Sequence, residues 1–174
     1  MKQGLRRPLE LLLASLIALV LSMGCGRDIG SPRFFADQTY HYETLRTIGN
    51  AVSGGADIGE VHAVVSQIQA GDEQGWFEAW ERMARRLEAR AGELRDPTSK
   101  GLALMRTHTY YRTAEFFLPP EDAKRSETYR LGIESFRAGL RLLGVKHRFL
   151  EVPYEGQVLP AVYYPGPPGA EHRS

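Results

Sequence analysis

Apolar side chains recur at helical spacing over five stretches between residues 37 and 143, and this periodicity predicts five amphipathic helices. The expected helices cover 37–48, 57–69, 76–94, 99–118 and 122–143, and Asp96-Pro97, Pro119-Pro120 and Gly144 mark boundaries between them. The expected buried stripes are Tyr42, Leu45 and Ile48; Ile58, Val61, Val64, Val65 and Ile68; Trp76, Trp80, Met83, Leu87, Ala91 and Leu94; and Tyr129, Ile133, Phe136, Leu140 and Leu143.

After residue 145 the pattern changes to that of β-strands. The runs Phe149–Pro153 and Val158–Tyr164 predict two strands, joined by a turn at Tyr154-Glu155-Gly156. A lone two-stranded hairpin is marginally stable in water, so we expect further strands or a helical face to cover this one. The proline- and glycine-rich segment that follows predicts a flexible tail over 166–174.

The stretch Gly54–Glu60 (GGADIGE) combines three glycines with two carboxylates just before the second expected helix. A phosphate-binding loop would use free backbone N–H groups, and a Lys and a Ser or Thr would follow the glycines, which is not the case here. Asp57 and Glu60 instead have the spacing of a capping box. We therefore interpret the stretch as a tight turn and a helix start.

The N-terminal residues predict an export signal. Lys2, Arg6 and Arg7 precede the apolar run Leu11–Met23, which has 13 residues and is too short for a comfortable membrane-spanning helix. Small residues flank Cys25, and this favours a lipoprotein-type signal peptide over 1–25 with lipidation at Cys25, followed by a linker over 26–36. The expected location is the bacterial cell envelope or the exterior, with membrane contact only through the signal or lipid. The alternative is a misassigned start or an uncleaved tail, which would leave the protein cytoplasmic.

Composition excludes several classes of function. The chain has 22 basic and 21 acidic side chains without a basic block, so a nucleic-acid partner is not expected. One cysteine rules out an internal disulfide framework and a multi-cysteine zinc site. The five histidines are scattered; His62 and His108 are interpreted as interface or surface residues. We expect no metal and no cofactor.

Candidate chemistry is sparse. No Gly-x-Ser-x-Gly nucleophile elbow occurs, so no catalytic residue is assigned. Aromatic and charged residues crowd the end of the fourth expected helix, at Tyr110, Tyr111, Arg112, Glu115, Phe116 and Phe117. One interpretation is core packing with a local Arg112–Glu115 ion pair; the other is that part of the cluster lines a substrate cavity.

Several blocks in this order resemble one family. They are Phe34-Phe35; Tyr42-Glu43-x-Leu45-Arg46-x-Ile48-Gly49; Gly54–Glu60; Gly71-Asp72 with Trp76-x-x-x-Trp80; Arg106-x-x-x-Tyr110-Tyr111-Arg112-x-Ala114-Glu115-Phe116-Phe117; Val152–Gly156; and Leu159-Pro160. This series is similar to the N-terminal region of α/β-hydrolases related to 2,6-dihydropseudooxynicotine hydrolase and the FrsA-like, dipeptidyl aminopeptidase-like esterases.

The resemblance implies a mainly α fold: an antiparallel helical cap domain over 37–145, then a hairpin over 146–165 that begins an α/β-hydrolase sheet truncated in this chain. It implies the lid of a serine hydrolase acting on an ester, amide or activated C–C bond, with catalytic groups supplied elsewhere. Trp76, Trp80, Tyr110, Tyr111 and Phe117 become candidate pocket walls. The implied partner is a separately encoded catalytic domain or a second copy of the chain.

The alternative is a non-enzymatic helical adaptor. Paired helices with Trp and Tyr at packing positions are typical of tetratricopeptide-like envelope lipoproteins that bind a partner. The sequence shows no repeat of about 34 residues, which argues against this class.

Overall fold

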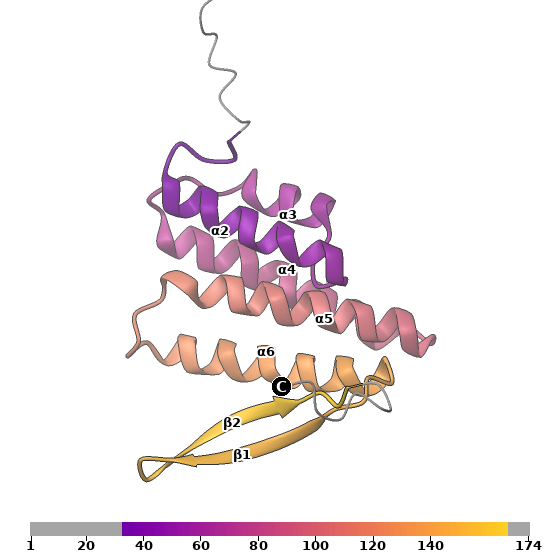
Figure 1. Ribbon diagram of the computed structural model, residues 1–174. Coiled ribbons are helices and arrows are strands. Elements are labelled where there is room, and N and C mark those ends of the chain that lie inside the picture. Colours follow the sequence, from indigo (N-terminus) through magenta and orange to yellow (C-terminus); the bar gives the residue numbers. More distant parts are fainter. Residues whose placement is uncertain (1–32, 167–174) are drawn as a thin grey trace, which may run out of the picture. The chain divides into compact units, whose positions relative to one another are not determined.

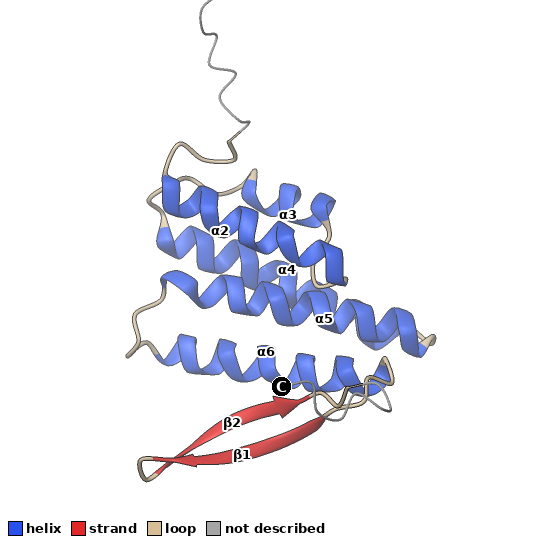
Figure 2. Cartoon of the chain, viewed as in Figure 1, coloured by secondary structure: helices blue, strands red, loops and turns tan. Residues whose placement is uncertain are grey.

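The computed structural model describes residues 33–166, and the predicted signal peptide, Cys25 and the tail lie outside this range. The chain divides into Met1–Arg33 and Phe34–Ser174, and all of the described helices and strands belong to the second unit. In chain order they are α2 (Gln38–Gly49), the 3-10 turn η1 (Asn50–Ser53), α3 (Ile58–Val65), α4 (Glu73–Glu93), α5 (Pro97–Ala114), the 3-10 turn η2 (Glu115–Phe117), α6 (Ala123–Leu142), β1 (Arg148–Tyr154) and β2 (Gln157–Tyr163) (Figures 1 and 2). This confirms the mainly α fold with a C-terminal hairpin.

Each of the five helices begins at an aspartate. The carboxylates of Asp37, Asp57, Asp72, Asp96 and Asp122 accept hydrogen bonds from backbone N–H groups of the first turn, at 2.7 to 3.0 Å. Such a cap satisfies a donor that the helix itself leaves free, and each contributes about 1 kcal/mol. The sequence therefore marks every helix start with the same local chemistry.

The core lies where α2, α3, α4 and α5 meet, and two tryptophans one turn apart on α4 form its centre. Trp76 packs edge-on against Tyr40 of α2, with ring centroids 5.2 Å apart, and Trp80 lies against Tyr110 of α5 at 5.4 Å. The Trp76 indole N–H donates to the Thr113 carbonyl at 2.7 Å. The stripe predicted for this helix is confirmed in its main members, because large aromatic rings bury most area when they face inward.

Helices α5 and α6 pack through small side chains. The residues that α6 buries are Thr128, Gly132, Ser135, Gly139 and Leu140. A Cβ on Gly139 would lie 2.9 Å from the Met105 sulfur and 3.3 Å from the Gly101 carbonyl, so the two backbones approach closely. The predicted stripe of α6 was therefore wrong in most of its members: the ring of Tyr129 is exposed, and Ile133 and Phe136 are half-buried.

Helix α2 differs from expectation in the same way. Tyr42 and Leu45 are exposed, whereas Tyr40, Glu43, Thr44 and Thr47 are buried. Threonine hydroxyls tolerate this position because each donates to the carbonyl four residues earlier, at 2.8 Å. The buried Glu43 carboxyl lies 3.1 Å from Arg46 Nε, and burial raises its pKa.

Helix α3 is shorter than the pattern predicts. It ends at Val65 rather than near Gln69, and the segment expected as a loop before it contains the η1 turn. Val61, Val64 and Val65 are buried as expected, but Ile58 at the helix start is exposed. A first-turn side chain lies at the edge of the packing surface, so the apolar period overestimates the buried stripe here.

The hairpin follows the predicted strands within two residues. Tyr154 pairs with Gln157 across a two-residue turn, and both turn residues, Glu155 and Gly156, have positive φ (46° and 76°). This is the conformation of the type I′ turn, whose twist matches that of the strands. In this register Pro153 and Pro160 occupy non-hydrogen-bonded pairs, so neither proline removes a bond between the strands.

Within residues 33–166, no helix combines the length and apolar character needed to cross a bilayer.

Candidate functional site

The five predicted pocket residues lie in or beside the helical core. Trp76, Trp80, Tyr110 and Tyr111 are fully buried, and Phe117 is half-buried against Tyr40. The structure brings the first three and Phe117 into one aromatic cluster, while the Tyr111 hydroxyl donates a hydrogen bond to Glu88 of α4. In the described structure these side chains pack the core; their role as walls of a substrate pocket stays a prediction.

The GGADIGE stretch is tied to α5 by a polar network centred on Tyr110. The Asp57 backbone N–H donates to the Tyr110 hydroxyl at 2.9 Å, and that hydroxyl donates to the Glu60 carboxylate at 2.8 Å. Arg106 Nε completes the network with a 3.0 Å bond to the same carboxylate oxygen. Burial, together with the neighbouring Glu60 carboxylate, raises the pKa of the Tyr110 phenol.

The capping interpretation of this stretch is confirmed for one arm and wrong for the other. The Asp57 side chain caps the helix by accepting from the Glu60 N–H at 3.0 Å. The reciprocal bond of a capping box is replaced, because Tyr110 takes the Asp57 N–H and Glu60 turns to Tyr110 and Arg106. Gly54, with φ of 77°, closes the preceding turn as expected.

The charged part of the aromatic cluster forms the predicted ion pair. Arg112 binds the buried Glu115 carboxylate, and its guanidinium group also lies over the Tyr129 ring, 4.9 Å from the centroid. Burial, with Arg46 and Arg125 nearby, lowers the pKa of Arg112. Arg106 and Arg112 bind different carboxylates, so they do not converge on one ligand.

The histidines offer no assembled site in the described part of the chain. His62 is exposed, whereas His108 is partly buried between α5 and α6, where its Nδ1 lies 2.9 Å from the Gly132 carbonyl. Burial lowers the pKa of His108, which favours the neutral ring. Over residues 33–166 no group of three His, Cys, Asp or Glu side chains is placed to hold a metal ion.

The most unusual surface is the face of the hairpin that points away from α6, which we call the outer face. Its apolar side chains are Leu150, Val152 and Tyr154 on β1 and Leu159, Ala161 and Tyr163 on β2, and all but Ala161 are exposed. Alternation along a strand normally sends polar residues to water and apolar ones to the core. A hairpin that is apolar on both faces has the composition of a strand pair buried on both sides.

The opposite face of the hairpin forms a groove with α6. Phe149, Pro160 and Val162 face Ile133 and Phe136 across a cavity of about 330 Å³, and Arg137 lies over the Phe149 ring at 4.8 Å from its centroid. Part of the apolar stripe of α6 therefore packs against the hairpin, while its Phe136 ring also lies 4.9 Å from the His108 ring of α5.

Comparison with known proteins relates the chain to hydrolases. It is 32% identical over 142 residues to Hydrolase LUC6 of Fusarium sp, and 30% identical over 142 residues to 20-hydroxy-prefusarin hydrolase FUS2 of Gibberella moniliformis; each match covers 78% of this chain and 34% of the relative. Alpha/beta hydrolase xenA of Xenoacremonium sinensis is 28% identical over 138 residues, covering 77% of this chain and 32% of that protein. No family model matches the chain.

These matches relate the chain to the α/β-hydrolases. It spans about a third of the length of the curated relatives that it matches. The relatives named here are fungal.

Two features of the site were not predicted from the sequence. The Tyr110–Glu60 bond joins residues 50 positions apart, and no periodicity reports such a pairing. The apolar outer face could have been predicted, because both expected strands carry hydrophobic residues at consecutive positions, and consecutive side chains of a strand point to opposite faces.

Proposed function

We propose that this chain is the N-terminal lid portion of a serine α/β-hydrolase, and that the outer face of its hairpin packs against the catalytic domain. The observation that carries the proposal is an apolar strand pair left open on one face, in a chain whose matches cover only 34% of its hydrolase relatives. The reactive groups would come from that domain, encoded in the same reading frame or separately.

The physical support is the cost of leaving the outer face in water. Burial of a Leu, Val or aromatic side chain contributes about 1.5 to 3 kcal/mol, and five such side chains of the outer face are exposed. The two strands also leave their outer edges without partners among the described residues. Edges of this kind are templates for another strand, so a continuing sheet would cover faces and edges together.

The finer assignment rests on the family resemblance. The intact enzyme would act on an ester, amide or activated C–C bond, as expected of relatives of 2,6-dihydropseudooxynicotine hydrolase and the FrsA-like esterases. In such an arrangement the helices shape the entrance to the active site and exclude water from it.

The docking role of the outer face can be tested on the 174-residue chain. We expect the wild-type chain to bind the dye ANS or to self-associate, and the pair of substitutions Val152→Asp and Leu159→Asp to suppress both. Val52→Asp is the matched control, because Val52 is almost fully exposed on the η1 turn and lies outside the hairpin. Equal dye binding and equal sedimentation for all three proteins would contradict the proposal.

The hydrolase assignment has its own test. The coding DNA after Ser174, or a neighbouring gene, is expected to encode a Gly-x-Ser-x-Gly elbow. Joined to that segment, the chain should hydrolyse a nitrophenyl ester, and the chain alone should not. If the chain alone hydrolyses the ester and a serine-directed inhibitor abolishes this activity, the proposal that another segment supplies the reactive groups is refuted.

Export is a separate proposal, because residues 1–25 lie outside the described part of the chain. We infer cleavage before Cys25 with lipid attached to that cysteine. Intact-mass measurement of the N-terminal peptide from expressing cells would show the lipid, whereas an unmodified Met1 would contradict export.

A further inference from the structure

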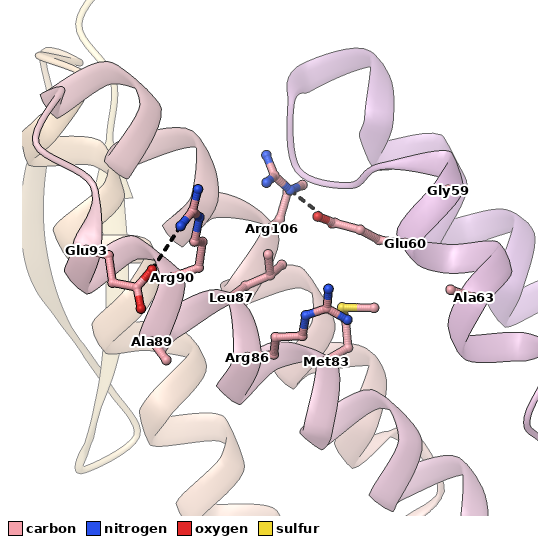
Figure 3. Close-up of a pocket in the computed structure, with 10 residues that line it drawn as sticks. All are labelled: Gly59, Glu60, Ala63, Met83, Arg86, Leu87, Ala89, Arg90, Glu93 and Arg106. Carbon is pink, nitrogen blue, oxygen red and sulfur yellow. Dashed lines mark hydrogen bonds and ion pairs between the residues drawn. The ribbon is translucent and has the colours of Figure 1, made fainter.

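A second cavity, remote in sequence from the hairpin, opens between α3, α4 and α5 and has a volume of about 720 Å³ (Figure 3). Its floor is apolar: Leu87 is buried, Met83 is half-buried, and Ala63 forms part of the α3 wall. Its rim carries the guanidinium groups of Arg86 and Arg90 from α4 and of Arg106 from α5. A cavity with an apolar floor and a cationic rim suits a ligand that has an apolar body and an anionic group.

Arg106 is held in place before any ligand binds. Its Nε donates to the Glu60 carboxylate at 3.0 Å (Figure 3). The Tyr110 hydroxyl in turn donates to Glu60 at 2.8 Å. The bond to Glu60 uses Nε and leaves the two terminal nitrogens of the guanidinium group as further donors. A guanidinium group fixed in this way loses little conformational entropy when it binds an anion.

The charges around the cavity do not cancel. Three arginines face two glutamates, and both glutamates are paired: Glu60 with Arg106 and Glu93 with Arg90, at 3.0 and 2.9 Å. Arg86 makes no ion pair within residues 33–166, so the rim carries one uncompensated positive charge. Figure 3 shows Arg86 beside Met83 and Leu87, where charge and apolar surface meet.

We propose that this cavity binds an organic monocarboxylate. The hydrocarbon or aromatic body lies on Met83 and Leu87, and the carboxylate accepts hydrogen bonds from Arg86 and Arg106. The volume falls within the range of about 300 to 1,000 Å³ that is typical of small-molecule sites. Charge-assisted bonds from guanidinium groups to carboxylates are among the stronger polar contacts in proteins. The proposal does not depend on the hydrolase assignment, because it uses none of the hairpin or α6.

Octanoate is a suitable probe, and the full 174-residue chain is titrated by calorimetry and by NMR of its methyl groups. We expect saturable binding, with shifts of the Met83 and Leu87 methyl signals. Arg86→Gln should weaken binding about tenfold, as the loss of one charged hydrogen bond predicts. Arg82→Gln is the matched control: Arg82 is one turn away on the same helix, is exposed and does not line the cavity, so octanoate binding should change less than about twofold.

Two further measurements separate the carboxylate from the apolar part of the ligand. Octan-1-ol has the same chain length without the charge and should bind at least about tenfold more weakly. Inorganic phosphate has charge without a hydrocarbon body and should not shift the Met83 or Leu87 signals. Ala63→Phe should fill the cavity and abolish octanoate binding, and a thermal melt would verify its fold.

The proposal is overturned by absent saturation with octanoate, or by equal octanoate affinity in the wild type and Arg86→Gln. Equal affinity for octanol excludes the carboxylate contact. Methyl shifts that fall elsewhere in the chain exclude this cavity even where Ala63→Phe does not fold.

Discussion

Replacing Tyr110 by phenylalanine tests the network that anchors the GGADIGE turn to α5. The substitution keeps the buried ring and removes only the hydroxyl, which accepts from the Asp57 N–H at 2.9 Å and donates to Glu60 at 2.8 Å. A donor left without a partner costs about 1 to 3 kcal/mol, and a hydrogen bond to a charged group contributes about 1.5 to 3 kcal/mol. Because Glu60 keeps Arg106, the expected loss in unfolding free energy is about 2 to 3 kcal/mol.

The neighbouring Tyr111→Phe substitution is the matched control. Its ring is equally buried, but its hydroxyl donates to Glu88, an exposed carboxylate that water can solvate when the bond is lost. The expected loss is therefore about 0.5 to 1 kcal/mol. Urea unfolding followed by tryptophan fluorescence measures both changes, and with a slope of about 2 kcal/mol per molar urea the two midpoints should differ by roughly 0.5 to 1.2 M.

The reasoning is refuted if both substitutions lower the midpoint equally. A double-mutant cycle of Tyr110→Phe with Glu60→Gln adds a second criterion. Since the two groups share a direct bond, their coupling energy should exceed about 0.5 kcal/mol, whereas additive losses would show that the hydroxyl acts through another contact.

Three further predictions concern packing, capping and protonation. Gly139→Ala should lower stability by about 1 to 3 kcal/mol, because its Cβ would meet Met105 and the Gly101 backbone. Gly92→Ala, at an exposed position near the end of α4, should raise stability by about 1 kcal/mol. Thermal melts that shift in the same direction for both variants would contradict the close approach at Gly139. Asp57→Ala removes the α3 cap and should cost about 1 kcal/mol in urea unfolding, and an unchanged midpoint would refute the capping role. Burial lowers the pKa of His108, so the stability linked to its neutral ring is present above the ordinary pKa of about 6.5 and is lost as pH falls below it. The urea midpoints measured at pH 7.5 and at pH 5.5 should therefore differ less in His108→Gln than in the wild type. An identical pH dependence in both proteins would exclude this linkage.

Much of the local structure could be predicted because its causes are local. An aspartate precedes each helix, and its short carboxylate reaches N–H groups two or three residues on, a range that a sequence displays directly. The two-residue turn of the hairpin follows from Glu155-Gly156 between two apolar runs. The tryptophan stripe of α4 was also predictable, since no other face of that helix carries comparable apolar area.

The candidate surfaces depend on contacts that the sequence does not report. The apolar stripe of α6 is real, but it packs toward the hairpin through Ile133 and Phe136. The adjacent stripe, with Gly132 and Gly139, lies against α5 because small residues let two helix backbones come close. A helix with two faces that can pack has no intrinsic preference for burying either one. The neighbouring elements determine which face lies against which partner.

The sequence by itself thus predicted the five helices and two strands, with their starts within three residues of those observed, the cap at Asp57 and the absence of a nucleophile elbow from this chain. Only the tertiary structure decided which faces of α2 and α6 are buried, that Tyr110 bridges Asp57 and Glu60, and that one apolar face of the hairpin stays open. The physical reason is range: caps and turns act over a few residues, whereas burial depends on shape complementarity between segments that are distant along the chain.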